Sequence, residues 1–378
     1  MYLNSLKIHN FRNIPKLEED FDPGFNIIVG GNAQGKTNLL EAIFILTSVR
    51  SFRGSRTVEL LTKDSGEQTT ASCVIQGRLK VGSVDKELKM SIDAQGKKIS
   101  LNGKEVKKAE DIMSQFKAVV FTPDDLGIIK GGPEARRRYI DMVAFNIRPG
   151  HWRILKRYHT VLQHRNKLLK MGIHDRSQLE PWENQLADYG AQVIQGRILA
   201  IKELNPIVEA VFVRLAGSGS PKIDFFYNST LLTQNSEDFE DAEKIKEFFK
   251  ELLARRRKEE LRRGTTLTGP HRDDLQLILG DKDMRDYGSQ GQQRMLTLAL
   301  KFGEVEAISN FWGEQPILLL DDISSELDFE KNSRLLSLVF ESKPQVFLTT
   351  TDPNLTLPGQ LGPHAKFEME EGVLERIH

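Results

Sequence analysis

The sequence predicts an α/β fold in which a phosphate-binding domain is interrupted by a mainly helical insertion. A glycine-rich turn lies between an apolar strand and a helix near the start of the chain. Near the other end, a second apolar strand brings two aspartates to the edge of a sheet. The long stretch between them sustains no heptad pattern, so we expect an inserted lobe and no long coiled coil. The expected segments are residues 1–125, the first part of the α/β domain; 126–263, a basic arm lobe; and 264–378, the second part of the α/β domain.

Composition excludes several classes of protein. The 378 residues carry 53 Lys+Arg and 53 Asp+Glu, so net charge predicts no partner and any basic surface depends on local segregation. Cys73 is the single cysteine, which excludes an internal disulfide and a cysteine zinc cluster and fits a reducing cytoplasm. No apolar run approaches the roughly 18 residues of a membrane span, and the start lacks the order of a signal peptide. We therefore expect a soluble cytoplasmic protein.

The first motif lies in DPGFNIIVGGNAQGKTNLLEAIFIL, where the apolar run Phe25–Val29 suits a buried strand. Gly30–Thr37 match G-x-x-x-x-G-K-T, and apolar residues then follow at helical spacing. Glycines let backbone N–H groups turn toward phosphates, Lys36 supplies charge to the β- and γ-phosphates, and Thr37 is a ligand for Mg²⁺. A chance glycine-rich turn is the alternative, and it leaves the flanking strand and helix unexplained. The residues expected to bind the nucleotide are Gly30, Gly31, Asn32, Ala33, Gln34, Gly35, Lys36, Thr37 and Asn38.

The second motif, PILLLDDISSELD, reads as the buried strand Ile317–Leu320 followed by two carboxylates. Asp321 is placed to hold Mg²⁺ opposite Thr37, and Asp322 to orient or deprotonate the attacking water. A helix N-cap followed by a turn would explain one aspartate but not two in a chain that already has a phosphate-binding loop. We therefore expect Asp322 and Lys36 to be catalytic.

The stretch YGSQGQQRM, Tyr287–Met295, has two interpretations. Its serine and glycines stand where a turn opens into a helix, a place where N–H groups can hold a phosphate. An ordinary N-cap at Ser289 is the alternative, and the stretch taken alone favours it.

In this order, the glycine-rich loop, the serine-glycine helix start, the paired acids and SELD (Ser325–Asp328) resemble the nucleotide-binding heads of the ABC ATPase superfamily. In that superfamily two heads enclose two ATP molecules, and the signature of one head faces the phosphates held by the other. The resemblance implies an ATP-dependent homodimer. The signature residues expected to act across it are Ser289, Gln290, Gly291 and Gln292.

Within that superfamily the chain is identified as a member of the RecF family of bacterial recombination mediators. The matching stretches are LKIHNFRN near the start, FTPDDLGIIKGGPEARRRYID, QHRNKLL, TGPHRDDL, YGSQGQQR and LLLDDISSELD. The resemblance implies a role in DNA repair, recombination, replication and the SOS response, with slow, DNA-stimulated ATP hydrolysis as a regulatory switch. It also implies that RecR and RecO help it to load RecA at single-strand/double-strand DNA junctions.

Two features depart from general ABC practice. The strand QVFLTT (Gln345–Thr350) is followed by Asp352, where transporters place a switch histidine, so no residue is predicted to sense the γ-phosphate. A glutamine loop is not assignable either, although Pro123–Asp125 stand near its usual position.

Positive charge is segregated within the insertion. Residues 142–174 hold seven Lys/Arg, four His and no acid, ARRRKEELRR (Ala254–Arg263) is a further basic cluster, and Arg136–Arg138 form a third. A solvated helix face explains any one cluster, but together they predict a stripe that binds DNA phosphates. His271, in GPHRDD, has no second metal ligand at useful spacing, and the role of that motif stays open. The residues expected to contact DNA are Arg136, Arg137, Arg138, Arg153, Lys156 and Arg157.

Two other functions compete with a DNA-binding ATPase. A small-molecule P-loop kinase would need an acceptor pocket with a lid, and it leaves the signature and SELD without a role. The motor subunit of an ABC transporter would carry another signature and the switch histidine that is missing here.

Overall fold

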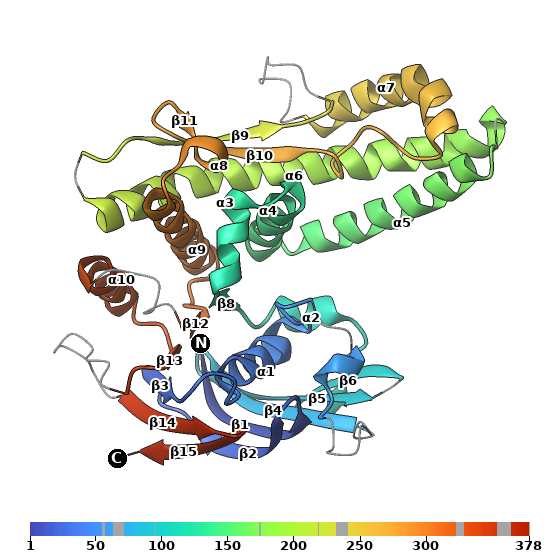
Figure 1. Ribbon diagram of the computed structural model, residues 1–378. Coiled ribbons are helices and arrows are strands. Elements are labelled where there is room, and N and C mark those ends of the chain that lie inside the picture. Colours follow the sequence, from blue (N-terminus) through green and yellow to red (C-terminus); the bar gives the residue numbers. More distant parts are fainter. Residues whose placement is uncertain are drawn as a thin grey trace. The chain divides into compact units, whose positions relative to one another are not determined.

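The computed structural model divides by internal contacts into two units, which are described separately. The head unit comprises Met1–Asp125, Arg214–Ala216 and Glu304–His378, and the arm unit comprises Leu126–Val213 and Gly217–Gly303 (Figure 1). The structure describes residues 1–54, 57–62, 72–93, 95–173, 175–217, 219–231, 241–322, 329–353 and 364–377.

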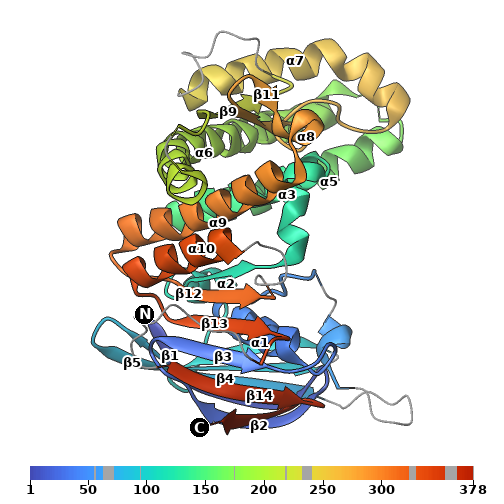
Figure 2. The same cartoon turned by 60° about the vertical axis from the view of Figure 1, so that its left-hand side comes forward.

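The head unit contains a mainly parallel sheet of six strands in the order β15-β14-β3-β13-β12-β8. Only β15, at one edge, runs antiparallel to its neighbour. Figure 2 shows β12, β13, β3 and β14 following one another across the sheet. The strands are β3 (Phe25–Val29), β8 (Ala118–Phe121), β12 (Ile317–Asp321), β13 (Val346–Thr350), β14 (His364–Glu370) and β15 (Val373–Ile377). Every residue of β3, β12 and β13 is buried, as expected for central strands covered on both faces.

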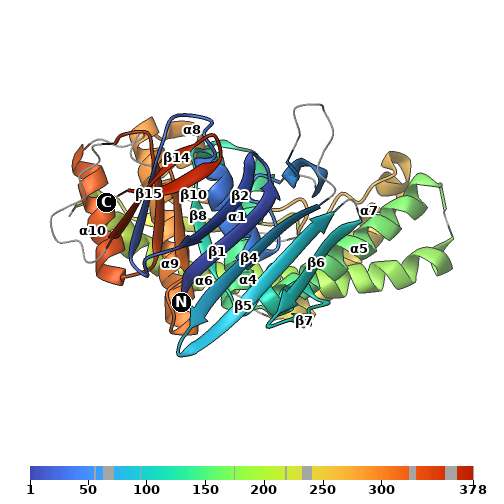
Figure 3. The same ribbon diagram turned by 90° about the horizontal axis from the view of Figure 1, so that it is seen from below.

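A second six-stranded sheet in the head unit is antiparallel, in the order β2-β1-β4-β5-β6-β7 (Figure 3). Its strands are β1 (Tyr2–Phe11), β2 (Ile14–Asp20), β4 (Ser72–Val81), β5 (Val84–Asp93), β6 (Gly96–Leu101) and β7 (Lys104–Glu105). In β4 buried residues alternate with exposed or half-buried ones over much of the strand, which is the pattern of a sheet with one face on the core.

Helix α1 (Lys36–Ser48) packs in the core that the two sheets share. Leu39, Leu40, Ile43 and Leu46 of this helix are fully buried among side chains of both sheets. The remaining helices of the head unit are α2 (Ala109–Met113) and α10 (Phe329–Ser342), with short 3-10 turns η1 (Thr57–Leu60) and η2 (Pro123–Leu126), the last of which ends in the arm unit. Burial of α1 fixes its first residues, Lys36 and Thr37, at the carboxyl end of β3.

The arm unit is mainly helical, with a three-stranded antiparallel sheet in the order β11-β10-β9. Its strands are β9 (Ile223–Asn228), β10 (Asp274–Leu279) and β11 (Lys282–Asp283). Its helices are α3 (Gly127–Lys130), α4 (Pro133–Ile147), α5 (Gly150–Lys170), α6 (Arg176–Ala216), α7 (Ala242–Arg263), α8 (Met284–Tyr287) and α9 (Gln290–Trp312); α6 and α9 end in the head unit.

Helices α5, α6 and α7 enclose an apolar core of their own. Local sequence explains their ends, because Asp175 and Asp241 accept hydrogen bonds from backbone N–H groups at the starts of α6 and α7. Gly264, with φ of 64°, ends α7 in the left-handed conformation that favours glycine. The longest helix that the structure describes is α6, with 41 residues. The described residues therefore form no long coiled coil.

The expected boundary after residue 125 coincides with the division into units, whereas the expected one after residue 263 does not. Residues 264–303 belong to the arm unit because β10 pairs with β9 and α9 lies against α6. At that contact a Cβ added to Gly303 would lie 2.4 Å from Cγ2 of Val208. No helix among the described residues is long and apolar enough to span a membrane.

Candidate functional site

The loop between β3 and α1 favours glycine at two positions, one for lack of space and one for its backbone conformation. A Cβ on Gly30 would lie 2.4 Å from the carbonyl oxygen of Met369, and Gly35 has φ of 117°. The Gly30 N–H donates to the carbonyl of Thr350 on β13 (3.2 Å), which ties the start of the loop to the sheet. The expected nucleotide-binding residues, 30–38, thus form one continuous turn into the start of α1.

Lys36 lies inside this loop rather than in solvent. Its Nζ donates to the carbonyls of Gly30 (2.8 Å) and Gly31 (2.7 Å), and the residue is only 7% exposed. Burial lowers the pKa of Lys36, and the nearby carboxylates of Asp322 and Asp321 oppose that shift. A phosphate entering the loop would replace these two neutral carbonyl acceptors with negatively charged oxygens.

The next feature joins the loop to the second motif. The Thr37 hydroxyl donates to Oδ1 of Asp321 (2.9 Å), and the Thr349 hydroxyl donates to the same oxygen (2.8 Å). Parallel pairing of β12 with β13 sets Asp321 opposite Thr349 and accounts for the second contact. Burial raises the pKa of Asp321, and the hydrogen bonds from Thr349 and Thr37 act against it. Hydroxyl and carboxylate oxygens at one point are the donor set that Mg²⁺ prefers, so the residues fit that ion.

Asp322 has an unusual backbone. Its φ is 49°, a left-handed value that aspartate tolerates better than most residues, and its N–H donates to the Thr349 hydroxyl (3.0 Å). Such backbone outliers gather at functional sites. The residues after it, including the expected SELD stretch at 325–328, lie outside the described part of the chain.

Asn13, which sequence reasoning missed, holds the phosphate-binding loop through two hydrogen bonds. Its Nδ2 donates to the carbonyl of Gln34 (3.1 Å), and its Oδ1 accepts from Nδ2 of Asn38 (2.8 Å). Asn13 belongs to LKIHNFRN, so the matching stretch was noticed while the bracing role was not. Thr349 is likewise not predicted from the sequence, although it belongs to the strand QVFLTT.

A buried carboxylate on α1 was also missed. Glu41 is fully buried and receives both arms of the Arg12 guanidinium, each at 3.0 Å. The Ser51 hydroxyl also donates to Glu41, and Arg53 donates to Asn38 (3.0 Å) at the loop. No motif flagged this pair, because Arg12 and Glu41 lie 29 residues apart.

The signature stretch forms the start of α9, and the whole of Ser289–Gln292 is exposed. Ser289 Oγ accepts from the Gln292 N–H (3.3 Å), while the Ser289 N–H donates to Oε1 of Gln292 (3.0 Å). This is a reciprocal capping box, so the N-cap interpretation is correct as far as it goes. Capping does not explain Gly291, since a Cβ there would meet no atom of the described residues within 4 Å.

The residues expected to contact DNA fall into two groups. Arg136 is wrong as a surface contact: it is 3% exposed and binds Asp274 with both arms (2.7 and 2.8 Å). Arg137 is half-buried and donates to the Asp273 carbonyl (2.7 Å), whereas Arg138 is exposed. A run of three arginines at the start of a helix cannot all face solvent, because successive residues point about 100° apart.

The second group lies on α5, where Arg153, Lys156 and Arg157 are all exposed. Arg157 lies over the ring of Tyr189 on α6, 5.8 Å from its centre, and donates to its hydroxyl (3.3 Å). These three cations share one accessible face with a neighbouring aromatic side chain, an arrangement that the predicted DNA-binding stripe needs.

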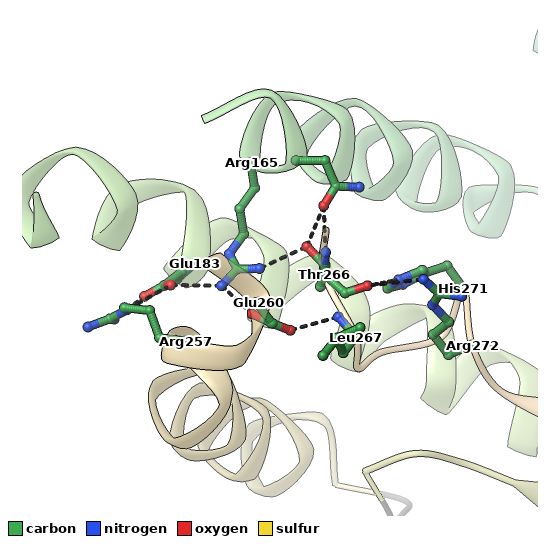
Figure 4. A network of polar contacts seen from close by, with 9 residues as sticks. Arg165, Glu183, Arg257, Glu260, Thr266, Leu267, His271 and Arg272 are labelled. Carbon is green, nitrogen blue, oxygen red and sulfur yellow. Dashed lines mark hydrogen bonds and ion pairs between the residues drawn. The ribbon is translucent and has the colours of Figure 1, made fainter. Parts of the chain in front are cut away.

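A buried polar network in the arm unit explains QHRNKLL and part of TGPHRDDL (Figure 4). Arg165, fully buried on α5, donates to Glu183 (3.0 Å), Glu260 (2.7 Å) and the Thr266 hydroxyl (2.8 Å). Glu260 also accepts from the Leu267 N–H (2.7 Å). One guanidinium therefore joins α5, α6, α7 and the loop after α7.

GPHRDD continues this network. His271 Nε2 lies 3.2 Å from the Thr266 carbonyl, which can only accept, so Nδ1 accepts from the Tyr158 hydroxyl (2.6 Å). Fully buried Asp273 accepts from the Thr230 N–H (2.8 Å) and from the Tyr227 hydroxyl (2.8 Å). The motif whose role was open is thus a structural element of the arm unit.

Comparison with known proteins agrees with this architecture. The family model described as RecF/RecN/SMC N terminal domain matches residues 2–360. A protein of Geobacter sulfurreducens named DNA replication and repair protein RecF is 37% identical over 377 residues, covering 100% of each chain. A solved structure of the recombination mediator protein RecF-ATP in the RecFOR pathway is 32% identical, with a TM-score of 0.89 over 100% of this chain and 98% of that one.

A solved Smc head bound to the C-winged helix domain of ScpA is 17% identical, with a TM-score of 0.57 over 100% of this chain and 98% of that one, and shows likeness of fold alone. The predicted ABC-type head fold is confirmed by these matches. The chain belongs to the RecF family of ABC-type ATPases.

Proposed function

We propose that this protein binds ATP at the head, dimerises through two shared ATP sites, and holds DNA while it is closed. Its role in DNA replication and repair follows from its membership of the RecF family. The observation that carries the proposal is the contact between Thr37 and Asp321, because it joins a phosphate-binding loop to a carboxylate at one sheet edge (2.9 Å).

At this site residues Gly30–Asn38 would surround the ATP phosphates, with Lys36 supplying positive charge. Thr37 and Asp321 would hold Mg²⁺, which when bound neutralises charge on the phosphates. Asp322 would accept the proton of the attacking water, since it follows Asp321 and lies close enough to influence Lys36. Asn13 and Thr349 position these groups through the hydrogen bonds already described.

The dimer proposal rests on the exposed start of α9. Ser289, Gln290, Gly291 and Gln292 face solvent, so all four are accessible to the phosphates of a second copy. Glycine is a poorer helix former than alanine, yet no described residue lies within 4 Å of a Cβ added at Gly291 and its backbone needs no positive φ. Close approach by another molecule would supply the missing reason.

Arg153, Lys156 and Arg157 on α5 would contact the DNA backbone, whereas Arg136 is buried and would not. We further propose that RecR and RecO act with this protein to load RecA at junctions of single- and double-stranded DNA. The RecFOR pathway in the description of the similar solved structure supports this assignment. The cytoplasmic location stays a prediction.

DNA-stimulated ATP hydrolysis tests the proposal. We expect slow turnover that rises on addition of gapped DNA and requires Mg²⁺. A P-loop kinase would instead need an acceptor substrate, and a transporter motor would be indifferent to DNA. Turnover that is unaffected by any DNA would contradict the proposed function.

A further inference from the structure

The arm unit contains a hollow at the basic cluster Ala254–Arg263, where the predicted DNA-binding stripe has no defined phosphate site. It has a volume of about 490 Å³ and lies between the end of α7 and the loop that follows it. We propose that this hollow is a phosphate-binding site, which in this protein takes a backbone phosphate of bound DNA. The choice of DNA rests on the proposed function. The residues lining the hollow are Thr230, Arg256, Glu259, Arg263, Thr265, Leu267 and Arg272.

The charge of the hollow is positive. Among the residues that the structure describes, the lining carries the three guanidinium groups of Arg256, Arg263 and Arg272 and the carboxylate of Glu259. All three arginines are exposed, so their charges are available to a ligand from solvent. Guanidinium groups are the preferred partners of phosphate oxygens, because their forked N–H groups can bond two oxygens at once.

Arg256 differs from its neighbours on α7. Arg255 pairs with Glu251 (3.3 Å) and Arg263 with Glu259 (2.9 Å). Arg256 makes no hydrogen bond or ion pair with any residue that the structure describes. An exposed guanidinium group that lines the hollow without a carboxylate partner is free to bind a phosphate oxygen.

The walls of the hollow are held in place before any ligand arrives. Leu267 is tied to Glu260 (2.7 Å), and Thr266 to Arg165 (2.8 Å), as Figure 4 shows. On the other side, the Gly269 N–H donates to the Thr230 hydroxyl (2.9 Å). Figure 4 also shows Arg272 beside His271, next to this fixed loop. Fixed walls reduce the entropy lost on binding, so a small anion can be held by a few contacts.

The test compares two pairs of substitutions on the same helix. Arg256→Gln/Arg263→Gln removes two charges from the hollow. Arg255→Gln/Arg262→Gln removes two charges from adjacent positions that do not line it, with the same spacing. Each pair also breaks one surface ion pair four residues apart, so the control is matched in that respect as well.

DNA affinity is measured from low to moderate salt. The hollow variant should bind about tenfold more weakly, and its log–log salt slope should be shallower by about 0.9 for each lost phosphate contact. The control should change much less. Equal changes in the two variants would mean that only total charge matters, and would overturn the DNA assignment.

A second experiment asks whether free phosphate is the ligand. Inorganic pyrophosphate is titrated into the full chain carrying Lys36→Ala, with and without the hollow substitutions, and followed by phosphorus-31 line broadening. Broadening lost only in the hollow variant supports the phosphate site and, if DNA binding is unchanged, gives it a free phosphate ligand. If the hollow substitutions change neither DNA binding nor pyrophosphate binding, the proposal is overturned. If the unsubstituted protein fails to bind DNA at all, the proposed function fails. The pyrophosphate titration still shows whether the hollow binds phosphate.

Discussion

Thr37 and Asp321 lie 284 positions apart in the chain, yet the hydroxyl of one donates to the carboxylate of the other at 2.9 Å. The contact exists because β3 and β12 flank β13 in one parallel sheet, so their carboxyl ends open at the same edge. Nucleotide binding, metal binding and hydrolysis are all proposed at that edge.

Lys36→Ala should abolish detectable ATP binding and leave the fold intact. Within the described part of the chain, the Lys36 ammonium group donates to the carbonyls of Gly30 and Gly31 in its own loop, so its loss removes no contact between distant elements. Fluorescent-nucleotide titration measures binding, and circular dichroism checks the fold. Lys98→Ala, at an exposed position on β6, is the control and should bind ATP normally. Normal affinity in folded Lys36→Ala would contradict the assignment.

Asp322→Asn should separate binding from chemistry. Asparagine tolerates the left-handed φ of 49° at this position, so the backbone should keep its shape while the charge is lost. Turnover should fall at least about a hundredfold, with ATP still bound and the dimer accumulating. Steady-state hydrolysis and equilibrium binding are measured on the same sample. Unchanged turnover would place the base elsewhere.

The two groups of arginines should respond differently. Arg153→Gln/Lys156→Gln/Arg157→Gln should weaken DNA binding and flatten its salt dependence by up to about three contacts, without loss of stability. ATP binding in the absence of DNA should be unaffected. If DNA affinity and salt slope both stay the same, this face of α5 is merely solvated.

Arg136→Gln should act on stability instead. Losing this buried arginine and its pair with partly exposed Asp274 should cost about 3 kcal/mol of unfolding free energy. Arg138→Gln, two positions along and exposed, is the control and should cost little. Urea unfolding measures both variants, and a fully stable Arg136→Gln protein would contradict the burial argument.

The arm unit should lose stability in mild acid through His271. Burial lowers the pKa of His271 to about 4, whereas its ordinary value is 6.5. Between those values the unfolded chain binds a proton that the folded chain does not, so stability is kept above pH 6.5 and falls toward pH 4. The contribution approaches about 1.4 kcal/mol per pH unit within that window. His271→Asn should remove this part of the slope, as measured by urea unfolding at pH 5 and 7. An identical slope in the variant would show that His271 is not the group responsible.

Short motifs were enough to place the strand, loop and helix around Lys36, because glycine spacing and apolar periodicity are local. Their partners cannot be predicted in this way, because Thr349 reaches the site through the pairing of β12 with β13 and Asn13 through the turn between β1 and β2 of the other sheet. Clusters of charge misled at Arg136, because sequence shows that a charge is present and not which way it points. The boundary expected after residue 263 leaves 264–303 out of the arm unit, because the pairing of β10 with β9 joins segments that no local sequence pattern connects.

Ser289 tests most directly the central claim that ATP is shared between two copies of the chain. Ser289→Asp keeps an N-cap for α9 but sets a negative charge where the partner's phosphates are proposed to lie. Ser289→Ala removes the cap, at roughly 1 kcal/mol, without adding charge or bulk. Both should bind ATP as monomers, since the loop around Lys36 is untouched.

The measurement is sedimentation with and without ATP. The account predicts that the unsubstituted protein dimerises with ATP, that Ser289→Ala does so with little loss, and that Ser289→Asp stays monomeric and fails to hydrolyse ATP. A Ser289→Asp protein that dimerises with ATP and hydrolyses it normally would contradict the shared site.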